Sequence, residues 1–219
     1  MKTPSLFCFI VALLIAGCTI HENCADGINK LPMYGIGKKC NEQIEFDKIF
    51  LKDCDKSFKS RKIAAAHMVT RGWQYFHAKK FDTSMMRFNQ AWLLDTANAE
   101  IYWGFGNLLG MQKQFKESLP LFKKSLKIDS TNSKAWQDMS ISYGNIFFET
   151  KIETYLDSSI YATKKAIKLD SHNAQLYSQL TGSYSYFMQK DSAKKYLKIT
   201  EQLDPNAVNP EVKKLLSNK

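Results

Sequence analysis

Glycine and proline are scarce in this sequence of 219 residues, which contains 10 Gly and 5 Pro. Between residues 33 and 204 proline occurs only at Pro120. A fold of many short strands needs frequent turns rich in both residues, so their scarcity favours long helices joined by short turns. Apolar residues make up 44% of the chain, which excludes a protein that is disordered throughout.

The sequence also lacks the short motifs that identify many enzymes. It has no glycine-rich phosphate loop, no His-Glu-x-x-His and no Gly-x-Ser-x-Gly. It has no Cys-x-x-Cys pair, and its four histidines are scattered at positions 21, 67, 77 and 172. We therefore expect no metal site, no cofactor and no enzymatic activity.

Acidic residues are outnumbered, and the formal net charge is +10 with a pI near 9.3. Such a charge can indicate nucleic-acid binding. The excess is spread out, however, with 13 basic and 10 acidic residues in 18–110 and 17 and 11 in 111–219. Residues 1–17, described next, have the composition of an export signal, and we therefore expect no nucleic-acid partner.

Residues 1–17 have the composition of a secretory signal. Lys2 precedes an apolar run from Leu6 to Ala16, which is too short for a membrane-spanning helix of roughly 20 residues. The run ends Ile15-Ala16-Gly17-Cys18, which resembles a bacterial lipobox. The resemblance implies that residues 1–17 are removed and that Cys18 becomes the lipidated first residue. Thr19 is not the Asp that retains lipoproteins at the inner membrane, so we expect an exported protein anchored in the outer membrane and facing the periplasm. The alternative is an ordinary cleaved signal followed by a chance cysteine.

Three cysteines remain after the lipidation site, at positions 24, 40 and 54. Export permits disulfide formation, and an odd number leaves one thiol unpaired. A Cys40–Cys54 disulfide could connect the first helix to the segment before it. The alternative is that all three thiols are free.

An internal repeat organises the rest of the chain. The pattern apolar-Asp-x-x-Asn occurs at Leu94, Ile128 and Leu169, and a variant occurs at Leu203. The four Asp residues are separated by 34, 41 and 34 positions. A period of 20–50 residues indicates an array of stacked units, each unable to bury its apolar face alone.

Small and aromatic residues recur at matching positions within these units. The set comprises Gly72, Tyr75, Phe81, Ser84, Phe88 and Ala91; Tyr102, Phe105, Gly106, Phe115, Ser118, Phe122 and Ser125; Trp136, Met139, Ser140, Tyr143, Ser159 and Ala166; and Tyr177, Leu180, Tyr184, Ala193, Leu197 and Pro205. Over residues 65–207 the chain thus resembles the tetratricopeptide repeat (TPR) family, and specifically small bacterial TPR lipoproteins. The resemblance implies an all-α fold, a right-handed α-α superhelical stack of about four hairpins with flanking helices.

The expected organisation follows from these patterns. We expect a signal peptide over 1–17, a lipid-anchored tether over 18–41, a leading helix over 42–64, and a closing helix over 208–219. The four repeats are expected at 65–98, 99–132, 133–173 and 174–207. The third has seven extra residues around Ile146–Ile152, which we interpret as longer facing helices.

In this family the first helix of each hairpin lines the concave side of the stack. Residues four apart share a helix face, and the repeat spacing then identifies the side chains expected to point inward. The expected partner-binding residues are Trp73, His77, Trp103, Asn107, Met111, Ile141, Asn145 and Tyr186. Gly110, Gly144 and Gly182 near this lining could admit a peptide backbone. The alternative for Trp73 and Trp103 is packing between adjacent hairpins.

Two functions fit such a lining. The first is an interaction scaffold that binds a protein or peptide on the concave face, because exposed apolar patches and aromatic residues are typical of contact sites. The second is a module that binds glycan or another small ligand on the same aromatic lining. The carboxylate clamp of some TPR domains is excluded, because Asp138 stands where a cation is needed. The sequence does not identify the partner or the oligomeric state.

Overall fold

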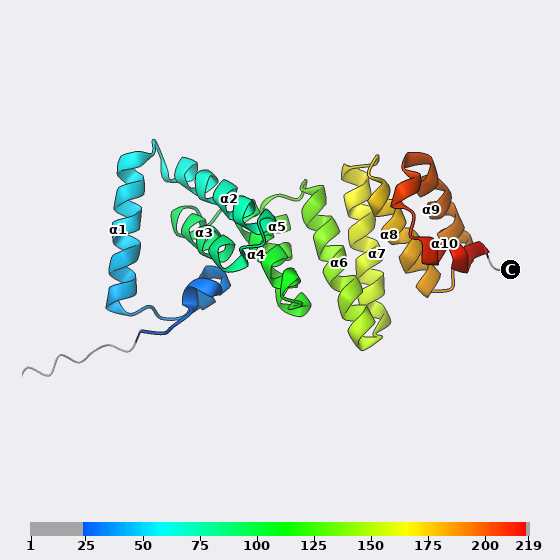
Figure 1. The fold of residues 1–219 in the computed structure, drawn as a ribbon, viewed down its shortest axis with the longest axis horizontal. Helices are drawn as coiled ribbons and strands as arrows, with labels where there is room; N and C mark the ends of the chain where they lie inside the picture. Colours follow the sequence, from blue (N-terminus) through cyan, green and yellow to red (C-terminus); the bar gives the residue numbers. More distant parts are fainter. Residues whose placement is uncertain (1–23, 218–219) are drawn as a thin grey trace, which may run out of the picture.

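The helices of this protein pair into hairpins that follow one another along an elongated array (Figure 1). The computed structural model describes residues 24–217, and within them the regular structure is helical. A leading helix α1 (Asn41–Ser57) precedes four hairpins. These are α2 (Arg61–His77) with α3 (Phe81–Leu94), α4 (Ala99–Met111) with α5 (Phe115–Ile128), α6 (Ser133–Thr150) with α7 (Glu153–Leu169), and α8 (Ala174–Tyr186) with α9 (Lys190–Leu203). Helix α10 (Pro210–Ser217) closes the array.

The repeated Asp and Asn residues separate one hairpin from the next. Asp129 follows the last residue of α5 and accepts a hydrogen bond from the backbone N–H of Thr131 at 2.9 Å. Asn132 then caps α6 by accepting from the N–H of Ala135 at 3.1 Å. Equivalent Asn caps begin α4 and α8, so this motif ends one helix and starts the next by local hydrogen bonding alone.

The small residues of the repeat allow the helices to approach closely. A Cβ added to Gly104 would lie 2.4 Å from the ring of Phe88, and one added to Gly106 would lie 2.7 Å from that of Phe122. Both phenylalanines are almost completely buried. Glycine at these two positions is therefore required by packing.

The third hairpin is longer than its neighbours, as the extra residues predicted. Helix α6 has 18 residues and α7 has 17, whereas α4 and α8 have 13 each. Phe147 and Phe148 lie on the extension, as expected, and the ring of Phe148 packs 4.9 Å from that of Tyr186 on α8. The extension therefore lengthens the surface between α6 and α8.

The N-terminal segment is more structured than the tether predicted over 18–41. Residues 24–40 form the short 3-10 segments Ile28–Lys30 and Pro32–Ile36 and pack against α3. Asn89 of α3, which is fully buried, donates hydrogen bonds to the carbonyl oxygens of Asn29 and Leu31 at 3.0 and 2.9 Å. The leading helix is also shorter than predicted, because residues 61–64 already belong to α2.

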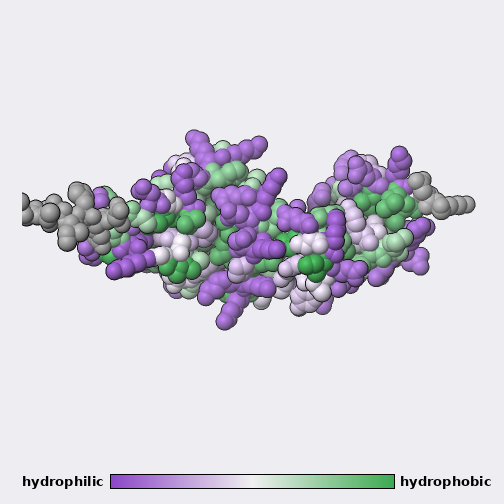
Figure 2. Space-filling model, turned by 90° about the horizontal axis from the view of Figure 1, so that it is seen from below, coloured by the Kyte–Doolittle hydropathy of each residue, from purple (hydrophilic) through white to green (hydrophobic). Residues whose placement is uncertain are grey.

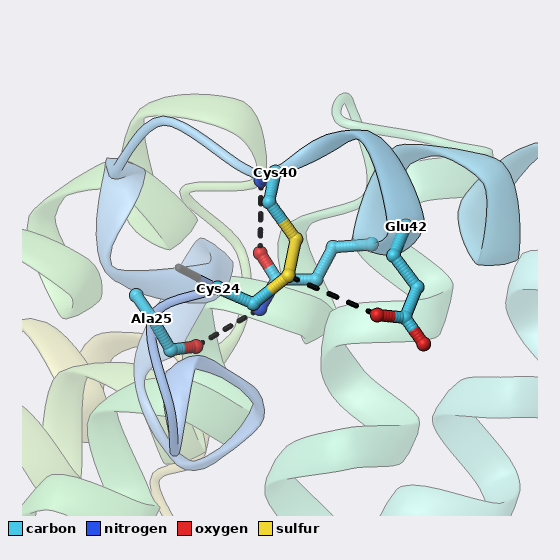
Figure 3. The surroundings of a disulfide bond; sticks show 5 residues. Cys24, Ala25, Cys40 and Glu42 are labelled. Carbon is cyan, nitrogen blue, oxygen red and sulfur yellow. Dashed lines mark hydrogen bonds between the residues drawn. A yellow bond between two sulfur atoms is a disulfide. The ribbon is translucent and has the colours of Figure 1, made fainter. Parts of the chain in front are cut away.

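The predicted disulfide pairing was wrong, and so was the alternative of three free thiols. Cys24 and Cys40 form the disulfide (Figure 3). Cys54 is free and buried. Cys40 caps the start of α1, and Cys54 lies 14 residues further along that helix, roughly 21 Å away at 1.5 Å per residue. That separation is far beyond the reach of a disulfide. Residues 1–23, including the predicted signal and Cys18, lie outside the described residues.

No helix in residues 24–217 combines the length and the apolar character that crossing a membrane requires.

Candidate concave binding site

The predicted partner-binding residues all lie on the first helices of the hairpins, but they form two separate groups. The ring of Trp73 on α2 stacks on that of His77 and lies close to that of Trp103 on α4, whereas Ile141, Asn145 and Tyr186 line a groove between α6 and α8. Met111 lies at the end of α4, is 55% exposed and belongs to neither group.

The first group is a packed aromatic cluster. The ring centroids of Trp73 and Trp103 lie 4.4 Å apart, and the ring of Trp73 also packs edge-on against that of buried Phe88. Both tryptophans are partly buried against the cores of their hairpins. These contacts correspond to packing between adjacent hairpins, which was the alternative interpretation of the two side chains.

Asp138 of α6 joins this cluster across the boundary between the second and third hairpins. Its Oδ2 accepts a hydrogen bond from Trp103 Nε1 at 2.7 Å and another from Asn107 Nδ2 at 3.0 Å. Burial raises the pKa of the Asp138 carboxyl, and the two hydrogen bonds oppose that shift. Trp103 Nε1 and Asn107 Nδ2 therefore already have hydrogen-bond partners within the protein.

The second group lines a groove of about 330 Å³ between α6 and α8. Helix α7 contributes Leu156 and Ser159, both buried; Asn209, which precedes α10, and Val212 of α10 complete the lining. Ile141, Phe148 and Tyr186 are at least 44% exposed along it. The groove thus combines open apolar side chains with amide and hydroxyl groups.

None of the 15 residues that line this groove is charged, although charged residues make up 24% of the sequence. Its polar residues are Ser140, Asn145, Ser159, Gln175, Ser178, Gln179, Ser183, Tyr186 and Asn209. The Oε1 atom of Gln179 is buried and has no hydrogen-bond partner. A buried amide oxygen normally has one, so Gln179 brings an unsatisfied acceptor to the wall of the groove.

Two helical glycines also line the groove, and packing does not require either of them. A Cβ added to Gly182 would meet nothing within 4 Å, and one added to Gly144 would meet only Ser159 Oγ at 3.7 Å. Glycine inside a helix is less favourable than alanine by about 0.5–1 kcal/mol. Gly144 and Gly182 therefore leave backbone open to the groove at a cost in stability.

Sequence reasoning missed part of this site. Gln175 and Gln179 lie on α8 beside positions that the repeat spacing identified, so a wider inward face would have included them. Asn209 and Val212 were not predictable, because they reach the groove only through the way α10 packs on α8 and α9.

Several solved structures share this fold. MamA aligns with a TM-score of 0.58 and 16% identity, over 73% of this chain and 87% of that one. TTC0263, a thermophilic TPR protein of Thermus thermophilus, aligns at 0.57 and 17%, over 69% and 79%. PilF of Pseudomonas aeruginosa aligns at 0.60 and 16%, over 71% and 67%. No protein family model and no curated protein sequence matches the chain.

Proposed function

We propose that this chain, which has the TPR fold, is a non-catalytic scaffold that binds an extended polypeptide segment in the groove between α6 and α8. The observation that carries the proposal is the pair of glycines that open the groove without being needed for packing. Similarity to TPR proteins supports a protein partner in general.

The chemistry of the lining favours an uncharged segment. A partner with a carboxylate or ammonium group in the groove would be desolvated there with no opposite charge beside it, which is costly. An extended backbone, in contrast, offers N–H and C=O groups that match the carboxamides of Asn145, Gln175 and Gln179. Apolar side chains of the segment would pack on Ile141 and Tyr186.

We further propose that the mature protein begins at a lipidated Cys18 and is held at the periplasmic face of the outer membrane. The support is the signal-like run followed by Ile-Ala-Gly-Cys. The test is mass spectrometry of the N-terminal peptide from membranes of cells that express the parent or Cys18→Ser. An acylated Cys18 in the parent supports the proposal, and an unmodified N-terminus at another residue contradicts it.

The groove is tested by photo-crosslinking in the native envelope. A benzoylphenylalanine replaces Ile141 or Tyr186 in the groove or, as a matched control, Tyr161, which is 56% exposed on α7 and does not line this groove. We expect both groove positions to capture the same polypeptide and the control to miss it. The result that contradicts the proposal is an identical set of products from all three positions.

The uncharged amide and aromatic lining is also compatible with a glycan. Retention of the purified protein on immobilised glycan, lost on Tyr186→Ala and combined with no captured polypeptide, would favour that alternative function.

A further inference from the structure

The N-terminal cap, defined here as residues 24–49, carries several exposed apolar side chains beside the predicted anchor. Five large apolar residues in this short stretch are at least 40% exposed: Leu31 (50%), Ile36 (78%), Ile44 (40%), Phe46 (63%) and Ile49 (50%). Phe46 and Ile49 are three residues apart on α1 and so share one side of that helix. Scattered apolar residues are normal on a surface, but this density needs a cause.

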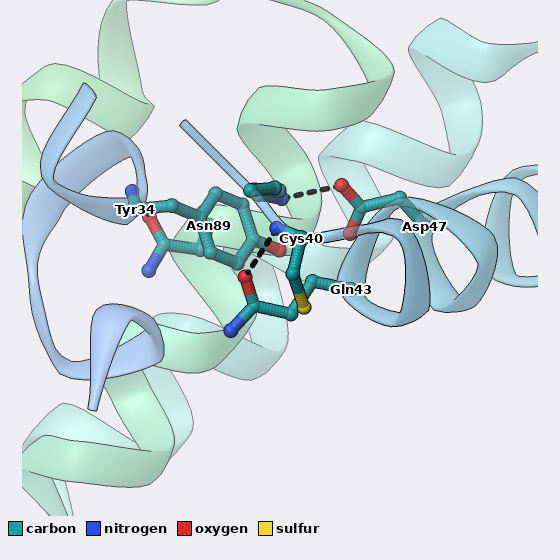
Figure 4. A network of polar contacts seen from close by, with 6 residues as sticks. Tyr34, Cys40, Gln43, Asp47 and Asn89 are labelled. Carbon is teal, nitrogen blue, oxygen red and sulfur yellow. Dashed lines mark hydrogen bonds and ion pairs between the residues drawn. The ribbon is translucent and has the colours of Figure 1, made fainter. Parts of the chain in front are cut away.

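The cap is held firmly, so these side chains are presented in fixed positions. The Cys24–Cys40 disulfide closes the segment, and Gln43 Nε2 donates to the carbonyl of Ala25 at 2.9 Å (Figure 3). On its other side, Asn89 Oδ1 accepts a hydrogen bond from the N–H of Tyr34 at 3.3 Å. Figure 4 shows Tyr34 and Asn89 beside Gln43 and Asp47 at the start of α1.

The backbone at and before Ile36 adopts a conformation that is unfavourable in free energy. Met33, Tyr34, Gly35 and Ile36 all have left-handed backbone conformations, with φ between 53° and 69°. For residues other than glycine this costs about 1–2 kcal/mol each, and it is least expected for a β-branched side chain. Yet Ile36 is among the most exposed apolar side chains of the described chain. Backbone strain of this kind clusters at sites of contact, so Ile36 is a candidate for one.

The charges of the cap are largely neutralised by ion pairs. Lys39 pairs with Asp47 and lies 3.2 Å from the ring centroid of Tyr34, Lys48 pairs with Glu45, and Lys30 pairs with Asp82 of α3, outside the cap. Residues 24–49 contain four basic and four acidic side chains. The cap therefore differs from the basic second half of the chain, and its exposed apolar groups are what it offers to a partner.

We propose that the N-terminal cap lies on the lipid bilayer that holds Cys18, with Ile36, Phe46 and Ile49 at the boundary between headgroups and acyl chains. The inference rests on the proposed lipid anchor. Cys18 and Cys24 are six residues apart, and six residues span at most roughly 20 Å when fully extended. With acyl chains in the membrane, Cys24 at the start of the cap stays within about 20 Å of the bilayer.

This arrangement orients the whole array. Figure 1 shows α1 and the N-terminal segment at one end of the long axis and α8 to α10 at the other. On the face that Figure 2 displays, hydrophobic residues form separate patches interrupted by hydrophilic ones, which favours a local contact over one spread along the array. Cap contact therefore keeps the α6–α8 groove away from the bilayer and open to the periplasm.

The test uses the full chain, expressed in bacteria, purified from their membranes and added to vesicles of phosphatidylethanolamine and phosphatidylglycerol. Benzoylphenylalanine replaces Ile36, Phe46 or Ile49 in the cap or, as a control, Leu215, which is 58% exposed on α10. Phe46 gives the most conservative replacement, so the test does not depend on the strained turn. Illumination is followed by mass spectrometry of lipid adducts, and circular dichroism confirms that each variant is folded.

We expect at least tenfold more lipid adduct at the cap positions than at Leu215, and no loss of adduct in 0.5 M NaCl, because the contact is apolar. Flotation of the vesicles reports the anchor separately. If the parent floats but the cap positions give no more adduct than the control, the cap proposal is wrong and the anchor proposal stands. If the parent does not float, both proposals are wrong.

Discussion

Replacing Gly182 by alanine should stabilise this protein. Gly182 lies inside α8, and an added Cβ would meet nothing within 4 Å. Alanine removes backbone freedom from the unfolded chain and adds no clash, which favours folding by about 0.5–1 kcal/mol. For a domain of this size, 1 kcal/mol corresponds to roughly 2–4 °C in Tm. We therefore expect Gly182→Ala to raise Tm by about 1–4 °C.

Gly104 provides the matched control. It too lies inside a helix, but its added Cβ would be 2.4 Å from the buried ring of Phe88. Overpacking of this kind costs about 1–3 kcal/mol, so Gly104→Ala should lower Tm by several degrees. Both variants are made in the soluble Cys18→Ser protein, defined here as residues 18–219 with that substitution and without the predicted signal, and are followed by circular dichroism at 222 nm. A fall in Tm for Gly182→Ala would refute the inference that this glycine has no packing role.

Three further outcomes are expected. Burial raises the pKa of Asp138, so its ionisation opposes folding as pH rises above the usual carboxyl range. Asp138→Asn should therefore increase the urea midpoint of unfolding more at pH 7 than at pH 4. Equal shifts of the midpoint at the two pH values would contradict this. In residues 18–219 with Cys18→Ser, which lack Cys8, maleimide should label no native thiol and only Cys54 after unfolding without reductant, whereas a second labelled cysteine would exclude the Cys24–Cys40 pairing. Asn89→Leu removes three hydrogen bonds to the N-terminal segment, so amide hydrogen exchange in residues 24–40 should increase at least tenfold while α6 to α9 remain protected. Unchanged exchange would contradict the role of Asn89 in holding this segment on α3.

The repeat was predictable because its capping hydrogen bonds join residues that are close together in the sequence. Asp129 and Asn132 act on backbone groups within three residues of themselves, so their spacing in the sequence is their spacing in the structure. Gly106 and Phe122 belong to the same periodic pattern, which indicated the fold class without knowledge of the tertiary path.

The disulfide and the site depended on contacts that the sequence does not encode locally. Cys24 meets Cys40 because Asn89, 49 residues beyond Cys40, holds the intervening segment on α3. Periodicity placed Trp73 and Trp103 on the inward face, but it could not tell that adjacent hairpins bring the two rings together. The open surface lies instead between α6 and α8, where the terminal helix completes it.

The most direct measurement of the central claim is the affinity of the polypeptide segment captured from Ile141 or Tyr186, prepared as a synthetic peptide. Isothermal titration of the soluble Cys18→Ser protein is compared with the same protein carrying Gly144→Ala and Gly182→Ala. The account predicts that the double variant is the more stable protein and binds the peptide at least tenfold more weakly, because the two methyl groups occupy the path of the peptide backbone. Equal affinity would contradict the claim that this groove is the binding site.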